Sequence, residues 1–241
     1  MPLDIVRIRA AFPGRRIDYY RSIDSTMRAA AGLETGAVVL AGEQTAGQGR
    51  LGRAWHSEAG AGVYCSIVLK PAPLLTLALG LAARSAILDA SGLTCDLRWP
   101  NDLMLADKKV GGILVQAADG HAIAGIGINV DQTAFPPEIA SEATSLRLQW
   151  GRPPGLPSST DILLALLPAI DRFLHRDPAS ILRLFAEASS YASGRRVTVR
   201  QPDGAIEGTT AGLDLSGFLI VRKDDGTDTL VLAGGVRASG S

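Results

Sequence analysis

A loop rich in glycine and arginine, residues 42–55, carries the side chains best suited to binding an anion. It reads Gly-Glu-Gln-Thr-Ala-Gly-Gln-Gly-Arg-Leu-Gly-Arg-Ala-Trp and has neither helical nor strand periodicity. Its glycines let the backbone approach a ligand and expose N–H groups. Arg50 and Arg53 can clamp a phosphate with paired donors, and Trp55 offers a flat ring face. A solvated loop without function is the alternative, but long loops inside compact domains are usually functional.

A second segment, residues 98–105, places polar residues between apolar runs. It reads Arg-Trp-Pro-Asn-Asp-Leu-Met-Leu, and turn chemistry alone could explain the Asn101-Asp102 corner. Lys109 follows at the mouth of an apolar strand that continues Val-Gly-Gly. A lysine there can stabilise negative charge that develops during a reaction. Lys108 fits better as an edge-strand charge that opposes aggregation.

A third segment, residues 125–130, reads Gly-Ile-Gly-Ile-Asn-Val. Glycines inside a strand indicate close approach by a ligand or by another backbone. Asn129 is the one side chain there that can reach a polar group. A tightly packed core strand is the alternative reading of this segment.

Regular elements are expected around these segments. Capping by Asp24-Ser25-Thr26 predicts a short helix over 27–32. The other expected elements are strands at 37–41 and 63–69, a helix at about 74–91, three strands within 97–131 that turn at Asp107-Lys108 and Asp119-Gly120, an irregular piece at 132–157, and helices at 161–175 and 179–189, the first kinked at Pro168.

The sequence pattern changes near Ser193. Short β segments follow, separated by Asp-Gly and Ser-Gly turns, at 196–200, 208–213, 217–222 and 229–232. Several short strands separated by such turns predict a small β-barrel. The sequence therefore predicts two domains, 1–193 and 194–241.

Composition indicates a soluble globular protein. Hydrophobic residues make up 46% and charged residues 20% of the 241 positions, and the formal net charge is zero. This balance argues against disorder and against global attraction to nucleic acid or to an anionic membrane. Cys65 and Cys95 fit reduced core thiols, the N-terminus has no secretory pattern, and the longest apolar stretch, 74–88, is too short to span a bilayer. We expect a cytoplasmic protein.

Taken together, the three segments resemble biotin protein ligases over roughly residues 18–236. The shared motifs are the Asp-Ser-Thr corner, Gly-Arg-Leu-Gly-Arg-Ala-Trp, Trp-Pro-Asn-Asp, Lys-Val-Gly-Gly-Ile-Leu and Gly-Ile-Asn. The resemblance implies that biotin contacts Ser25, Thr26, Gln44, Gly47, Gln48, Arg50, Lys109, Gly112 and Gly127. It implies that ATP or the adenylate contacts Arg50, Arg53, Trp55, Asn101, Asp102 and Asn129. It makes Lys109 and Arg50 the catalytic residues.

The resemblance also implies a reaction and a fold. Biotin would be activated by ATP as biotinyl-5′-AMP and passed to a lysine of the biotin carboxyl carrier protein of a carboxylase such as acetyl-CoA carboxylase. Magnesium would arrive on the phosphates, with Asp102 as a candidate ligand. The implied fold class is α+β. It comprises a mixed, largely antiparallel sheet flanked by helices, like that of class II aminoacyl-tRNA synthetases, and a small C-terminal SH3-like β-barrel.

Two positions depart from the family pattern. Gln48 stands where an arginine is usual, and Met27 stands where an asparagine often follows Ser-Thr. Both departures lie in motifs that the resemblance places at the biotin site.

Two other functions compete with the ligase reading. A lipoate-type ligase is disfavoured because its Arg-rich, double-glycine segment is absent. A biotin-sensing DNA-binding repressor is disfavoured because only some 17 residues precede the expected strand Asp18-Tyr19-Tyr20, too few for a helix-turn-helix. The neutral net charge also lacks the excess of basic residues typical of a DNA-binding protein. We expect no DNA or membrane partner. The sequence is compatible with a monomer and with a homodimer.

Overall fold

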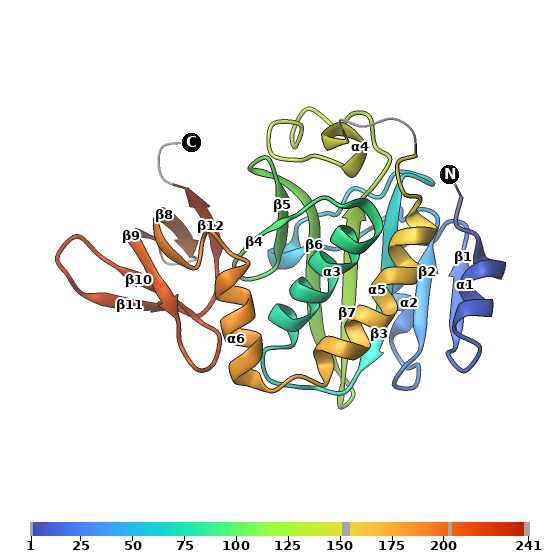
Figure 1. The fold of residues 1–241 in the computed structure, drawn as a ribbon, viewed down its shortest axis with the longest axis horizontal. Coiled ribbons are helices and arrows are strands. Elements are labelled where there is room, and N and C mark those ends of the chain that lie inside the picture. The colour runs from blue at the N-terminus through green and yellow to red at the C-terminus, as the bar shows by residue number, and fades with distance from the viewer. Residues whose placement is uncertain (1, 151–154, 202–203, 239–241) are drawn as a thin grey trace.

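Two β-sheets, one of seven strands and one of five, organise the chain (Figure 1). The structure is a computed structural model that describes residues 2–150, 155–201 and 204–238. Parts of the predicted irregular piece and of the C-terminal domain, residues 151–154, 202–203 and 239–241, lie outside the described residues.

The larger sheet is mixed and largely antiparallel, as the family resemblance implies. Its strands are β1 (Ile17–Tyr20), β2 (Val38–Ala41), β3 (Gly62–Leu69), β4 (Asp96–Arg98), β5 (Asp102–Leu105), β6 (Lys108–Ala118) and β7 (His121–Asn129). They follow the order β1-β2-β3-β7-β6-β5-β4, and only the β1–β2 pair is parallel. Because β3, β7 and β6 are central neighbours, the glycine-bearing segments of β6 and β7 lie side by side.

Helices cover both faces of this sheet. They are α1 (Ile5–Ala11), α2 (Thr26–Ala30), α3 (Leu75–Ser91), α4 (Leu146–Gln149), α5 (Ser159–Leu174) and α6 (Pro178–Glu187). Val38 of β2 belongs to the main core, whereas the next residue, Val39, packs with Met27 of α2. Successive strand residues point to opposite faces, so α2 covers the face opposite to that of α3 and α5.

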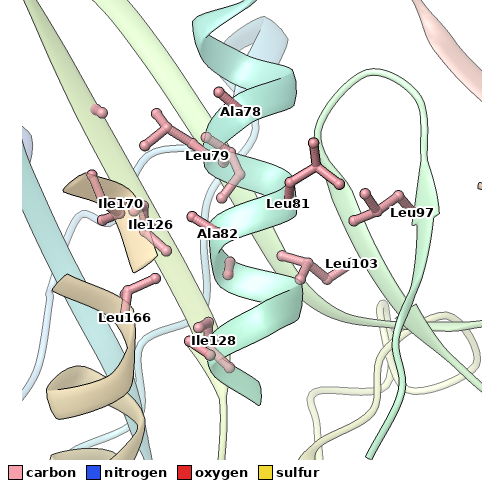
Figure 2. Close-up of a cluster of buried hydrophobic side chains, with 14 of the residues drawn as sticks. Ala78, Leu79, Leu81, Ala82, Leu97, Leu103, Ile126, Ile128, Leu166 and Ile170 are labelled. Atoms are coloured by element: carbon pink, nitrogen blue, oxygen red, sulfur yellow. The ribbon is translucent and has the colours of Figure 1, made fainter. Parts of the chain in front are cut away.

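The main core lies between α3, α5 and the sheet (Figure 2). Small and branched side chains of α3, such as Ala82 and Leu79, let the helix lie close to Ile126 of β7 and to Leu166 of α5. Burial of this apolar surface, at about 25 cal/mol per Å², stabilises the sheet that carries the functional segments.

The C-terminal unit is a five-stranded antiparallel sheet. Its strands are β8 (Ser193–Gln201), β9 (Gly204–Leu213), β10 (Leu219–Arg222), β11 (Asp228–Val231) and β12 (Gly235–Ala238), in the order β11-β10-β9-β8-β12. The buried indole of Trp99 donates from Nε1 to the carbonyl of Gly217, 2.8 Å away, and thereby joins this unit to the larger sheet.

Several predicted elements need correction. Residues 97–131 hold four strands where three are predicted, because β4 is too short to show a pattern. The turn between β5 and β6 falls on Ala106 and Asp107, both with positive φ, so Lys108 is the first residue of β6. Helices α1 and α4 and strand β12 have no counterpart in the prediction, and α5 runs on through Pro168.

Within the described part of the chain, every helix falls short of the length and apolar character that a bilayer crossing needs. Cys65 and Cys95 are both free and buried. Burial raises the pKa of each thiol to about 12, so both stay protonated and unreactive at neutral pH.

Candidate functional site

Two cavities meet beside strands β6 and β7. The larger has a volume of about 520 Å³ and opens toward the C-terminal sheet, and the smaller has about 40 Å³. Five of the described residues line both cavities, namely Gly49, Arg50, Trp55, Asn101 and Lys109. They therefore lie where a group bound in one cavity would meet a group bound in the other.

Backbone hydrogen bonds fold the Gly-Arg loop back on itself. Trp55 N–H donates to the carbonyl of Gly47 over 2.9 Å, and Gly49 N–H donates to Arg53 over 2.7 Å. A Cβ atom at Gly47 would lie 2.6 Å from the Trp55 carbonyl oxygen. Glycine is thus required at position 47 by this close approach of two backbones.

A chain of polar side chains borders the smaller cavity. Thr26 donates to Gln44 Oε1 from both its backbone N–H (2.8 Å) and its hydroxyl (3.0 Å). Gln44 in turn donates to Ser57, and Ser66 donates to Thr26. The hydroxyl of Ser25 is buried and has no hydrogen-bond partner in the structure. A buried hydroxyl without a partner is costly, and a polar ligand in this cavity would relieve that cost.

The indole of Trp55 forms the wall between the cavities. A Cβ atom at Gly127 would lie 2.4 Å from its Cε2 atom, and one at Gly112 would lie 3.4 Å from its Cζ3 atom. The two strand glycines therefore make room for an aromatic ring. The ammonium of Lys109 lies 5.5 Å from the ring centroid, within cation–π range.

Met27 occupies the far side of the smaller cavity. Its Sδ lies 2.8 Å from where a Cβ atom at Gly125 would stand. A flexible thioether thus fills the space above a strand glycine.

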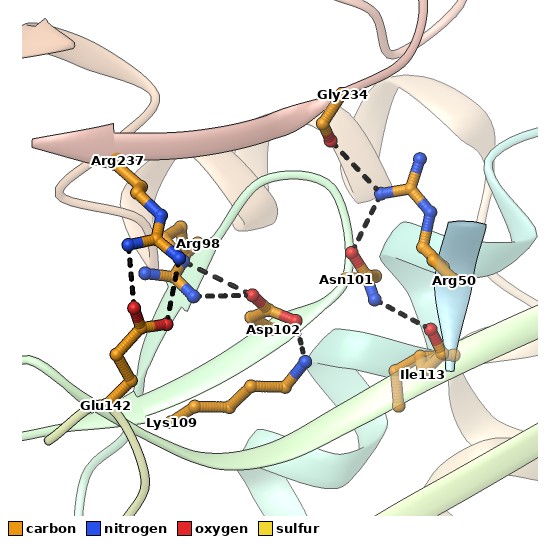
Figure 3. Close-up of polar contacts among 9 residues, drawn as sticks. All are labelled: Arg50, Arg98, Asn101, Asp102, Lys109, Ile113, Glu142, Gly234 and Arg237. Atoms are coloured by element: carbon orange, nitrogen blue, oxygen red, sulfur yellow. Dashed lines mark hydrogen bonds and ion pairs between the residues drawn. The ribbon is translucent and has the colours of Figure 1, made fainter. Parts of the chain in front are cut away.

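Asp102 holds two cations (Figure 3). Its Oδ1 lies 2.5 Å from Lys109 Nζ and its Oδ2 lies 2.7 Å from Arg98 Nη2. Burial raises the pKa of Asp102, but the charges of Lys109 and Arg98 outweigh burial, so the pKa lies below its ordinary value. The carboxylate therefore stays ionised and fixes the lysine at the mouth of β6.

Arg50 reaches from the loop to both sheets. Its Nη1 donates to Asn101 Oδ1 over 2.9 Å, and the carbonyl of Gly234 lies 3.5 Å from the same nitrogen (Figure 3). Asn101 is oriented by its own donation to the Ile113 carbonyl. Burial lowers the pKa of Arg50, and the charge of Arg53 acts in the same direction. The guanidinium is thus partly desolvated, which strengthens its attraction to an anion.

The segment 132–145 borders the larger cavity and is tied to Lys109. Lys109 N–H donates to the Glu142 carbonyl (2.7 Å), and Thr144 N–H donates to the Lys109 carbonyl (2.9 Å). Asn129, which is buried, donates to the carbonyl of Thr144. The Glu142 carboxylate pairs with Arg237 of β12 (Figure 3). This segment was expected only to be irregular.

Most of the residues expected from the resemblance lie at these cavities. The smaller one is lined by eight of the nine expected biotin contacts, namely Ser25, Thr26, Gln44, Gln48, Arg50, Lys109, Gly112 and Gly127. The larger one is lined by all of the expected nucleotide contacts, namely Arg50, Arg53, Trp55, Asn101, Asp102 and Asn129. Gly47 lines neither and acts in the loop backbone.

Sequence reasoning missed several lining residues. They are Arg98 at the polar corner, Phe135, Ile139, Glu142 and Ala143 of the irregular segment, and Arg200, Gln201 and Arg237 of the C-terminal sheet. The length of the irregular segment was a usable signal, because long loops often carry function.

The site does not fit a metal held by protein ligands. Both carboxylate oxygens of Asp102 are already engaged by cations. Among the residues that the structure describes, no group of three or more His, Cys, Asp or Glu side chains could hold an ion. Magnesium with mostly phosphate and water ligands is compatible with this arrangement, but Asp102 is not free to bind it.

The fold and the site define a class of cofactor-attaching ligases. The family model described as Biotin/lipoate A/B protein ligase family matches residues 16–132, and that described as Biotin protein ligase C terminal domain matches residues 192–235.

Comparison with known proteins narrows the class. The biotin--[acetyl-CoA-carboxylase] ligase of Mycobacterium tuberculosis is 32% identical, with 97% of this chain and 94% of the relative covered. A bifunctional ligase/repressor of Bacillus subtilis is also 32% identical, over 88% of this chain and 71% of the relative. A structure of the Aquifex aeolicus biotin protein ligase in complex with biotin and ATP superposes with a TM-score of 0.83 at 30% identity, covering 93% and 99% of the two chains. This chain belongs to the biotin protein ligase family.

Proposed function

We propose that this chain forms biotinyl-5′-AMP from biotin and ATP and then transfers the biotinyl group to a lysine of a biotin carboxyl carrier protein. The observation that carries this proposal is the pair of adjoining cavities, one small and polar, one large and basic, that share Arg50 and Lys109. Family membership supports it. Because the Mycobacterium tuberculosis and Aquifex aeolicus relatives are both named as biotin ligases, the lipoate alternative gains no support from them.

In this proposal biotin binds in the smaller cavity. The ureido group of biotin is polar and can satisfy the unpartnered hydroxyl of Ser25 next to Thr26 and Gln44. The cavity of about 40 Å³ holds little more than one or two waters. Biotin entry therefore requires the loop and Trp55 to shift away from Gly127. Gln48 lines the same cavity and offers an amide where the family usually has a charge.

The nucleotide then lies in the larger cavity with its α-phosphate beside Arg50 and Lys109. A carboxylate oxygen of biotin attacks the α-phosphorus, the bond to the β-phosphate oxygen breaks, and pyrophosphate leaves. The biotin carboxylate is already an anion, so this step needs no general base. The task of the two cations is to offset repulsion and to stabilise charge on the phosphorus oxygens. In the second step the carrier amine attacks the acyl carbon and AMP leaves.

Mass spectrometry of a purified biotin carrier domain tests the proposal. After incubation with the chain, biotin, ATP and magnesium, the domain should gain the mass of one biotin on one lysine. The gain should require ATP and magnesium, and lipoate in place of biotin should give none. An unchanged carrier mass at micromolar concentrations of folded enzyme would refute the proposed function.

A further inference from the structure

Among the residues that the structure describes, those lining the larger cavity carry more positive than negative charge. Six of them are basic, Arg50, Arg53, Arg98, Lys109, Arg200 and Arg237, and two are acidic, Asp102 and Glu142. A triphosphate carries an opposing charge of similar size. The basic residues differ, however, in whether they are free to bind a triphosphate.

Three of these six cations already have a carboxylate partner. Arg98 and Lys109 pair with Asp102, and Arg237 pairs with Glu142. Within residues 2–150, 155–201 and 204–238, Arg50, Arg53 and Arg200 make no ion pair, and Arg50 is held by its hydrogen bond to Asn101. Arg53 and Arg200 remain available for an anionic ligand.

Strand register places Arg200 beside Arg50. Arg200 of β8 pairs with Gly235 of β12, next to Gly234, whose carbonyl lies 3.5 Å from Arg50 Nη1. Val199 is buried in the C-terminal unit, so the alternation of a strand turns Arg200 outward, on the face that Gly235 and Arg237 share. Gly235 has no side chain, which leaves the cavity open on that side.

The lining of the cavity also gives the nucleotide a direction. Its apolar members near the segment 132–145, Phe135, Ile139 and Ala143, suit the flat base of the nucleoside. The unpaired arginines lie on the loop and on the C-terminal sheet. A nucleotide whose α-phosphate is held by Arg50 therefore points its base toward the segment and its terminal phosphates toward Arg53 and Arg200.

We propose that Arg200 is a positioning residue for the β- and γ-phosphates of ATP, so that the C-terminal sheet takes part in holding the leaving pyrophosphate. The inference rests on the proposed function. Arg237 has a different task, because its ion pair with Glu142 fixes the segment that borders the cavity.

Steady-state pyrophosphate release by the full chain tests this role. Arg200→Ala should raise the KM for ATP about tenfold, the effect of losing one charge-assisted hydrogen bond, and should leave the KM for biotin unchanged. Arg200→Lys should recover part of the loss because it keeps the charge. The affinity for a non-hydrolysable biotinyl-adenylate analogue, which lacks both terminal phosphates, should stay at the wild-type value in Arg200→Ala.

Arg222→Ala is the matched control. Arg222 also belongs to the C-terminal sheet but pairs with Asp228, away from the cavity. Its KM for ATP should equal that of the wild type. An unchanged KM for ATP in Arg200→Ala would refute the inference alone, and so would an equal loss of affinity for the adenylate analogue. A wild-type chain that releases no biotin-dependent pyrophosphate would refute the proposed function and this inference with it.

Discussion

Lys108 and Lys109 are neighbours in the sequence, yet their surroundings differ. Strand alternation turns them to opposite sides of β6, where Lys108 is exposed and Lys109 lies against Asp102 and Trp55. The side chain of Lys109 is 30% exposed and that of Asp102 is 16% exposed. A charge held in such a partly dry site acts on a neighbouring phosphate more strongly than the same charge in water.

We therefore predict that Lys109→Ala slows adenylate formation much more than it weakens ATP binding. The charge matters most when negative charge builds on the α-phosphate, and loss of one such donor costs about 10²–10³ in rate. Rapid-quench measurement of pyrophosphate release, together with ATP affinity from calorimetry, separates the two effects.

Lys108→Ala supplies the comparison at the adjacent position. It removes the same charge from the exposed side of the strand and should leave both quantities unchanged. Equal rate losses in the two variants would mean that the role given to Lys109 is wrong. Asp102 keeps Arg98 as a partner in Lys109→Ala, so the variant does not leave a buried charge unpaired.

At the residue scale, sequence reasoning succeeds where a site residue belongs to a local motif. Arg50, Asn101 and Lys109 each stand in a short run of glycines or polar residues between apolar strands. Glu142 and Arg237 lie 95 residues apart, and Arg50 and Gly234 lie 184 apart. No periodicity or spacing encodes such pairs, because they form only when the C-terminal sheet docks.

At the scale of elements, the Gly-Arg loop, residues 42–55, has little packing to keep it ordered. Its glycines and alanines offer little apolar surface, and Leu51 is 67% exposed. Fixing each backbone residue costs about 1–2 kcal/mol. Arg53 also lowers the pKa of Arg50, which reflects repulsion between the two charges when no anion is present. The smaller cavity, of about 40 Å³, is also too small for biotin unless the loop opens.

Hydrogen exchange of residues 44–55 should therefore be fast in the ligand-free chain and slow with a non-hydrolysable adenylate analogue. The ligand would neutralise both arginines and give Trp55 a surface to pack on, and the closed loop would keep water from the mixed anhydride. Strand β7, at residues 121–129, is central in its sheet and should be protected in both states. Strong and equal protection of the loop with and without ligand would show that it is preformed.

Apart from α1, the elements that the sequence did not reveal share one property, which is their short length. Strand β4 has three residues, β12 has four and begins with glycine, and α4 has four residues. Segments of this length hold too few apolar positions for a period of 2 or 3.6 to show. They are held by neighbours instead: β4 by pairing with β5, and β12 by pairing with β8. Longer elements such as α3 and β7 carry enough pattern to be predicted within one or two residues.

At the scale of the whole molecule, the two cavities are lined by different parts of the chain. Among the described residues, those that line the smaller cavity all lie between Ser25 and Gly127. The larger one also takes residues 200–201 and 233–237 from the C-terminal sheet. The division of the chain into domains 1–193 and 194–241 stays a prediction. Its boundary coincides with the first residue of β8, so a cut there removes the C-terminal sheet as a unit.

Truncation after Ser193 should consequently affect the two substrates unequally. Each unit buries apolar residues of its own, so residues 1–193 should fold, with lower stability because the Trp99 indole loses its partner Gly217. Biotin affinity should stay near the full-length value, whereas ATP affinity should fall by about tenfold or more, as expected when charged donors are lost. Calorimetric titration with each substrate, after circular dichroism has established folding, measures both. Unchanged binding of both substrates would show that the C-terminal sheet is dispensable. Equal loss of both would show that it supports the smaller cavity as well, contrary to the division of the site described here.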